Sequence, residues 1–158
     1  ARLWAGRKGA AGAMGHLAPN YYIQDGVVPR SKMVDVLARI EQIARRERLR
    51  VVNVFHAGDG NLHPTVVFDA REPGLLARVI DAGAQILRVC VDAGGTLSGE
   101  HGIGLEKMAY LDWVMSPADQ RAQHALKRVF DPTGHLNPGK PFSGSFPAPV
   151  AAVAVGVS

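Results

Sequence analysis

The sequence has little cysteine and no long hydrophobic run. Its single cysteine, Cys90, excludes an internal disulfide, and because it falls in an apolar helical pattern we expect a buried, inert thiol. No apolar run reaches the about 18 residues that a membrane-spanning helix needs, and the first residues lack the layout of a signal peptide. We therefore expect a cytoplasmic protein without a transmembrane segment, with peripheral attachment to a membrane as the alternative.

The composition is that of a globular protein. The chain has 158 residues, of which 47% are hydrophobic, so it can form one domain with a core. The net charge of +4 is spread along the chain and the densest basic run, residues 45–50, ends a predicted helix, which argues against nucleic acid binding. An anionic small substrate suits the same charge. The chain lacks an initiator methionine, and we expect it to be a piece of a longer protein.

The periodicity predicts an α+β fold. Strands are expected at residues 21–28, with an irregularity at Asp25, and at 51–56, 63–69 and 96–98. One amphipathic helix is expected to begin with Ser31 as its N-cap, and a second with Pro73 in its first turn. This order corresponds to a ferredoxin-like split βαβ arrangement, an antiparallel sheet with two helices on one face.

A further helix is expected in the C-terminal part of the chain. Ser116 precedes Asp119 by three residues, which is typical of a capping box, and the helix should run to about Val129. This forms a C-terminal helical segment beyond the sheet. Residues 142–158 show no periodicity, and we expect a disordered tail.

Two histidines flank a glycine-rich turn between the middle strands. Asp59 and Gly60 favour a hairpin, which brings His56 and His63 to the same end of the sheet. Both imidazoles can then meet one zinc-like cation at about 2.0 to 2.1 Å. The alternative is a polar hairpin in which Asp59 and Asn61 cap their own backbone.

A second glycine-rich cluster spans residues 99–104. Glu100 and His101 are adjacent, so we expect their side chains to diverge, one toward the metal and the other toward the substrate. The glycines around them let the backbone approach a flat ligand closely. A phosphate-binding loop is a weak rival, because the cluster lacks the lysine and serine or threonine of a P-loop.

Three segments resemble a known family. Residues 56–64, 94–107 and 130–140 closely resemble the C-terminal region of FAD-linked oxidases of the vanillyl-alcohol-oxidase type. Within that group the chain is most similar to the D-subunit of glycolate oxidase and to the D-lactate and D-2-hydroxyglutarate dehydrogenases. The resemblance covers residues 1–141. It implies a C-terminal cap domain that lacks the N-terminal FAD-binding domain of the family.

The resemblance implies roles for the two glycine-rich clusters. His56, His63 and Glu100 match the ligands of a divalent metal, zinc-like in character, and His101 matches the catalytic base. FAD would be held mainly by the absent N-terminal domain. The piece alone is therefore expected neither to hold FAD firmly nor to turn over.

The resemblance also implies how the substrate and the flavin are bound. Arg7 matches an arginine that holds the substrate carboxylate, and Asn137 lies in the segment that approaches the flavin. Relatives that act on 2-hydroxyglutarate carry a threonine and a lysine where this chain has Ala11 and Ile23. Neither side chain can bind a second carboxylate, which favours a monocarboxylate such as glycolate or D-lactate.

The sequence therefore predicts the C-terminal part of an FAD-dependent 2-hydroxyacid dehydrogenase or oxidase. Its partners would be a small 2-hydroxy acid, the N-terminal FAD-binding domain and an electron acceptor outside this chain. One alternative is a stand-alone metal-binding or regulatory module with the cap fold and no catalysis. Another is a metal-dependent hydrolase that uses His56, His63 and Glu100. An FAD-domain coding region in frame upstream separates the first prediction from the stand-alone module.

Overall fold

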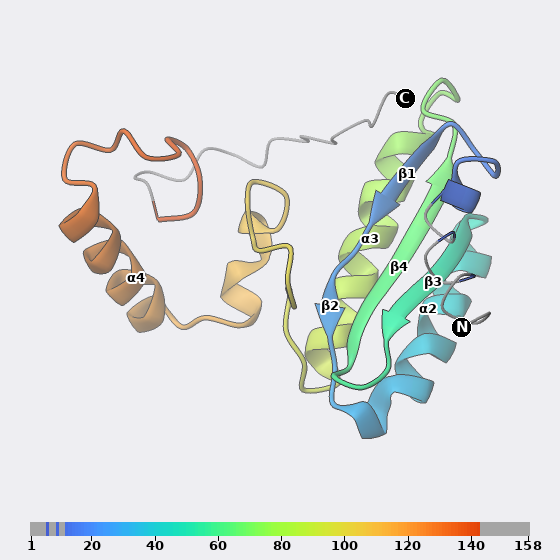
Figure 1. The fold of residues 1–158 in the computed structure, drawn as a ribbon, viewed down its shortest axis with the longest axis horizontal. Helices are drawn as coiled ribbons and strands as arrows, with labels where there is room; N and C mark the ends of the chain where they lie inside the picture. The colour runs from blue at the N-terminus through green and yellow to red at the C-terminus, as the bar shows by residue number, and fades with distance from the viewer. Residues whose placement is uncertain (1–5, 7–8, 10–11, 143–158) are drawn as a thin grey trace. The chain divides into compact units, whose positions relative to one another are not determined.

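A computed structural model describes residues 12–142 together with Gly6 and Gly9. These residues belong to two compact units that divide between Gly99 and Glu100. The first unit contains a four-stranded sheet and the helices α2 and α3 (Figure 1). Its elements are β1 (Asn20–Ile23), β2 (Gly26–Val27), the 3-10 turn η1 (Arg30–Lys32), α2 (Met33–Glu47), β3 (Arg50–His56), β4 (Asn61–Phe68) and α3 (Leu75–Asp92).

Strand β4 lies at the centre of the sheet. It pairs antiparallel with β3 on one side and with both β1 and β2 on the other. Val27 of β2 forms a further antiparallel bridge with Thr96. Across the sheet the order is therefore Thr96, β1 with β2, β4 and β3, as a split βαβ arrangement requires. The predicted α+β class is confirmed.

Helices α2 and α3 cover one face of the sheet (Figure 1). Their apolar stripes converge on Leu62 of β4, which is completely buried. The core that they share contains Val36, Ile40 and Ile43 of α2 and Ala82, Ile86, Val89 and Cys90 of α3. Burial raises the pKa of the Cys90 thiol to about 12, so the cysteine is the inert core residue that its sequence context indicated. Among the described residues, no helix is both long enough and apolar enough to cross a membrane.

The first strand is interrupted where the sequence indicated an irregularity. β1 ends at Ile23 and β2 begins at Gly26, with Gln24 and Asp25 between them. The ladder continues through the gap, because the Gln24 backbone N–H donates to the Pro64 carbonyl at 3.0 Å. The side chains of Gln24 and Asp25 are both fully buried. A buried carboxylate is rare in proteins unless it is paired, so this interruption marks a special position.

The last strand is shorter than the sequence predicts. Of the expected strand at 96–98, only Thr96 pairs, exchanging two backbone hydrogen bonds with Val27. The residues after it leave the ladder because Ser98 and Gly99 bind the side chain of Asp25 instead. Side-chain capture thus ends the strand.

The first helix does not begin at Ser31 as the sequence analysis expected. Pro29 precedes the 3-10 turn η1, α2 starts only at Met33, and no side chain caps either element. The Pro29 carbonyl accepts the Lys32 N–H at 2.8 Å. The chain therefore enters the helix through a backbone turn, with Lys32 as the N-cap of α2.

The turn between β3 and β4 depends on one glycine. Gly60 has φ +84°, and a Cβ there would lie 2.1 Å from the Val28 carbonyl oxygen. The Val28 N–H donates to the Gly60 carbonyl at 3.0 Å, so the turn is held against the end of the first strand. A side chain at Gly60 would have to break this close approach.

We expect Gly60→Ala to lower the free energy of unfolding by about 1–3 kcal/mol, the usual range for overpacking a tight site. Gly58 is the matched control, because it lies in the same turn and a Cβ there meets nothing within 4 Å. Urea unfolding of both variants measures the difference. Equal destabilisation by Gly60→Ala and Gly58→Ala would contradict the role given to Gly60.

The second unit contains the 3-10 segment η2 (Met108–Trp113) and the helix α4 (Pro117–Phe130). The Ser116 hydroxyl accepts the Asp119 N–H at 3.3 Å, and the Asp119 carboxylate accepts the Ser116 N–H at 2.8 Å. The predicted capping box and C-terminal helical segment are confirmed. Residues 143–158, most of the predicted disordered tail, lie outside the described residues.

Asp131 organises the loop after α4. Its carboxylate accepts the backbone N–H groups of His135 and Leu136 at 2.8 and 2.9 Å, and it pairs with Lys127 one helical turn earlier. The Lys127 hydrogen bond lowers the pKa of Asp131. The carboxylate therefore fixes the start of the segment that contains Asn137.

Candidate metal centre

The two histidines of the hairpin lie on the same face of the sheet. His63 of β4 pairs with Val54 of β3, and His56 is two residues further along β3, so the pleat directs both imidazoles to one side. Their ring centroids are 5.4 Å apart, and the rings meet edge to face. The hairpin thus brings the imidazoles together.

The turn between the histidines is closed by its own polar groups. The Gly60 N–H donates to the His56 carbonyl at 3.1 Å, and the Asp59 carboxylate accepts the Asn61 N–H at 3.0 Å. An Asx turn of this kind fixes the backbone on which both histidines stand. It is compatible with a metal site and with the polar hairpin alternative alike.

Asp25 approaches His63 from the neighbouring strand. Its carboxylate oxygen Oδ1 lies 3.9 Å from His63 Nδ1. The other oxygen, Oδ2, accepts the Ser98 hydroxyl at 2.6 Å and the Gly99 N–H at 3.0 Å. Asp25 therefore links the histidine to the backbone that leads into Glu100.

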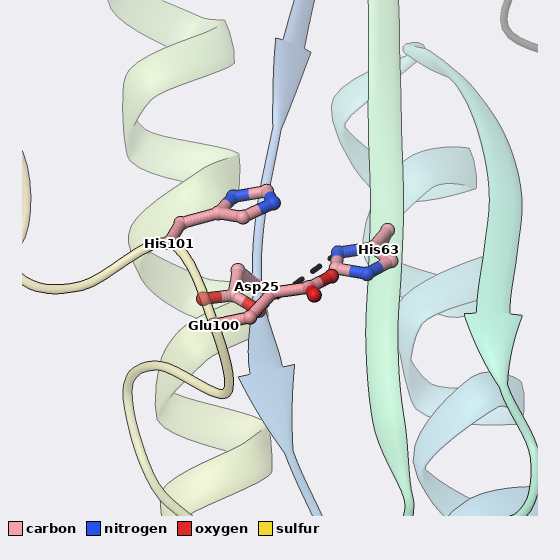
Figure 2. A group of neighbouring side chains, drawn as sticks. All are labelled: Asp25, His63, Glu100 and His101. Carbon is pink, nitrogen blue, oxygen red and sulfur yellow. Dashed lines mark ion pairs between the residues drawn. The ribbon is translucent and has the colours of Figure 1, made fainter.

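Four side chains offer donor atoms to one small region (Figure 2). One ligand atom from each of Asp25, His63, Glu100 and His101 lies within 4.8 Å of the others. Imidazole nitrogens and carboxylate oxygens together suit a zinc-like divalent cation. The fully buried Asp25 carboxylate adds negative charge beside an imidazole, which favours a cation further.

Glu100 and His101 each offer one ligand atom to this group. His56 lies outside the group, although its ring contacts that of His63. Asp25 was not predicted as a site residue, although an acidic residue inside an otherwise apolar strand pattern was the available signal.

A further candidate, Arg7, lies outside the described residues. Asn137 is an exposed residue of the loop after α4, in the second unit, with φ 50°, and its carbonyl accepts the Lys140 N–H at 3.1 Å. Its assignment to flavin binding stays a prediction.

A split βαβ sheet with two imidazoles and a buried carboxylate at one end defines an α+β domain with a candidate metal centre. The chain belongs to the FAD linked oxidases, C-terminal domain family, whose model matches residues 1–141. The resemblance inferred from the three motifs is therefore confirmed.

Several curated relatives support this membership. The chain is 50% identical over 139 residues to glycolate oxidase subunit GlcD of Escherichia coli K12, covering 88% of this chain and 28% of the relative. It is 39% identical over 141 residues to GlcD of Bacillus subtilis, covering 89% and 30%. It is 37% identical over 117 residues to a D-lactate dehydrogenase of Anaerostipes hadrus, covering 73% and 25%. The chain thus spans less than a third of the length of these relatives.

Proposed function

We propose that the chain is the cap part of a cytoplasmic FAD-dependent 2-hydroxyacid dehydrogenase or oxidase that converts glycolate or D-lactate to the 2-oxo acid. The observation that carries the proposal is the group of Asp25, His63, Glu100 and His101 in a member of this family. The names of the relatives, a glycolate oxidase subunit and a D-lactate dehydrogenase, support the same substrate class.

We assign the metal ligands to His56, His63 and Glu100. Two nitrogens bound to one zinc-like ion at about 2.0 to 2.1 Å are no more than about 4 Å apart. The imidazole rings of the two histidines lie on one face of the sheet with centroids 5.4 Å apart, which supports ligation of one ion by both. When bound, the cation acts as a Lewis acid that lowers the pKa of the substrate hydroxyl.

His101 is the proposed general base. It takes the proton of the substrate hydroxyl while the hydrogen on the α-carbon leaves with its electron pair. The substrate thus loses two electrons and two hydrogens in total, and FAD, when bound, would supply the hydride acceptor. Glu100 precedes His101 directly, and each offers one ligand atom to the same donor group, which supports a ligand and a base that act on one substrate hydroxyl.

The substrate is proposed to be a monocarboxylate. Arg7 holds its carboxylate through the two-pronged geometry of the guanidinium group. Ile23 of β1 and Ala11 provide no charge for a second carboxylate, which argues against 2-hydroxyglutarate. The relatives named above act, by their names, on glycolate and D-lactate.

An N-terminal FAD-binding domain is the proposed partner of α4. No side chain of α4 is buried. Four apolar residues of α4 and the loop after it are strongly exposed to solvent, with exposed fractions of 56% for Leu126, 73% for Val129, 75% for Phe130 and 56% for Leu136. Exposed apolar clusters of this kind mark interaction surfaces. Relatives more than three times as long as the match contain the additional sequence that such a domain needs. Asn137, next to Leu136, would then reach the flavin from this surface.

The test compares this chain with the longer protein that carries an FAD-binding domain before it. We expect this chain alone to be colourless and inactive, because most of the flavin site lies outside it. In the longer protein, anaerobic addition of glycolate or D-lactate should bleach the oxidised flavin band. D-2-hydroxyglutarate and L-lactate serve as matched acids and should bleach it slowly or not at all.

A yellow, FAD-bearing preparation of this chain alone would show that it holds flavin by its own residues. A longer protein whose flavin none of these acids reduces would contradict the proposed activity. The same outcome, together with stable zinc binding, would instead support a metal-binding module.

A further inference from the structure

We propose that Asp25 is a positioning residue of the metal centre, which orients the His63 imidazole and fixes the backbone that leads into Glu100. The inference rests on the proposed function in taking His63 and Glu100 as metal ligands. It adds a residue to which no role was assigned by the motifs. Its evidence lies within the first unit of the structure.

The Asp25 carboxylate is enclosed by protein and does not contact solvent. The residue is fully buried, and burying a carboxylate costs several kcal/mol unless charge and hydrogen bonds compensate. Gly26 allows this arrangement, since a Cβ there would lie 2.6 Å from Cys90 Sγ. The strand can therefore press against α3 at Gly26, while the carboxylate of Asp25 faces His63 (Figure 2).

One oxygen of the carboxylate fastens the downstream loop. Oδ2 accepts both the Ser98 hydroxyl and the Gly99 N–H, and the Asp25 backbone carbonyl also accepts the Gly99 N–H at 3.1 Å. Gly99 fits tightly, because a Cβ there would lie 2.7 Å from atoms of Asn61 and Val27. These hydrogen bonds hold the backbone at Gly99, one residue before Glu100, and so fix the position at which the second glycine-rich cluster begins.

The other oxygen faces the imidazole of His63. The distance from Oδ1 to Nδ1, 3.9 Å, is that of an ion-pair contact and longer than a hydrogen bond. A negative charge on this side favours the tautomer with its proton on Nδ1, which leaves the Nε2 lone pair for a metal. Metal-binding histidines commonly have such a carboxylate behind the ring, and its loss costs about 10- to 100-fold in metal affinity.

The inference is tested in this chain with Zn²⁺ as the probe. Competition with a chromophoric chelator gives the dissociation constant and stoichiometry for the parent chain, Asp25→Asn, Ser98→Ala and His63→Ala. Long-range ¹H–¹⁵N spectra of the metal-free chains, at about pH 8.5 where an imidazole is neutral, report the His63 tautomer. Ser98→Ala is the matched control, because it removes one hydrogen bond to Asp25 and leaves the charge.

We expect Asp25→Asn to weaken zinc binding about 10- to 100-fold without changing its stoichiometry. The same variant should lose the preference for a proton on Nδ1, whereas Ser98→Ala should keep it. His63→Ala should abolish binding at this site. The expected order of affinities is therefore parent, Ser98→Ala, Asp25→Asn and His63→Ala.

Unchanged affinity and tautomer in Asp25→Asn would overturn the inference. Loss of zinc as complete as in His63→Ala would also overturn it, because Asp25 would then be a ligand. If Asp25→Asn fails to fold, the parent chain still decides, since a proton on Nε2 of His63 contradicts the proposed orientation. If the parent chain binds no zinc, the proposed metal is wrong, and the tautomer still tests the link between Asp25 and His63.

Discussion

His101→Ala in the longer protein is expected to slow flavin reduction by roughly 10²- to 10⁴-fold, the usual contribution of a general base, while bound metal stays near stoichiometric. The variant removes the proposed base and leaves the proposed ligands His56, His63 and Glu100 in place. Glu100 and His101 both belong to one donor group, so distance does not decide which is the ligand and which is the base. We assign the two roles from the chemical properties of the side chains. A carboxylate is the harder ligand and a neutral imidazole the better proton acceptor near pH 7.

The measurement for His101→Ala is anaerobic stopped-flow reduction of the flavin, paired with metal analysis of the same sample. His16→Ala is the control, because His16 is an exposed histidine outside both glycine-rich clusters. It should match the parent protein in rate and metal content. The assignment of the base fails if His101→Ala empties the metal site.

His63→Ala is expected to lose both the metal and the activity. His63 is on β4, the central strand, and only 11% of its side chain is exposed, so the imidazole is held in place by the surrounding protein. Removal of a direct ligand should cost more than the about 10- to 100-fold in affinity that an outer-sphere partner contributes. Flavin reduction should then fall at least as far as in His101→Ala.

Metal analysis of His63→Ala and His56→Ala side by side tests the ligand set. We expect both to lose the metal, because the two imidazoles share one face and contact each other. If His63→Ala is metal-free while His56→Ala retains its full metal content, His56 is not a ligand, and Asp25 is favoured as the ligand in its place. Full metal occupancy in both variants would show that neither histidine of the hairpin is a metal ligand.

Local sequence signals predicted the features of the fold that depend on neighbouring residues. The hairpin follows from Asp59 and Gly60 between two β-branched runs, and the helix α4 follows from the capping box at Ser116 and Asp119. The N-cap of α2 is Lys32, one residue later than the expected Ser31, because the 3-10 turn η1 pairs the Lys32 N–H with the Pro29 carbonyl and the Met33 N–H with the Arg30 carbonyl. A favourable capping residue does not show which backbone groups are already paired.

The features that the sequence did not reveal depend on residues far apart in the chain. Asp25 binds Ser98 and Gly99, more than 70 residues later, and this capture ends the last strand at Thr96. No local pattern marks such a partnership. The motifs named His63, Glu100 and His101, whereas the buried carboxylate beside them is evident only once the sheet aligns β2 with β4.

The most direct test follows flavin reduction by glycolate and D-lactate in the longer protein before and after its divalent metal is removed with a chelator. We predict that bleaching of the flavin band is lost in the metal-free protein and returns when Zn²⁺ or another divalent cation is restored. The same treatment of His63→Ala should restore nothing. Equal rates of bleaching in the metal-loaded and metal-free protein would contradict the claim that this chain supplies a metal centre for 2-hydroxy acid oxidation.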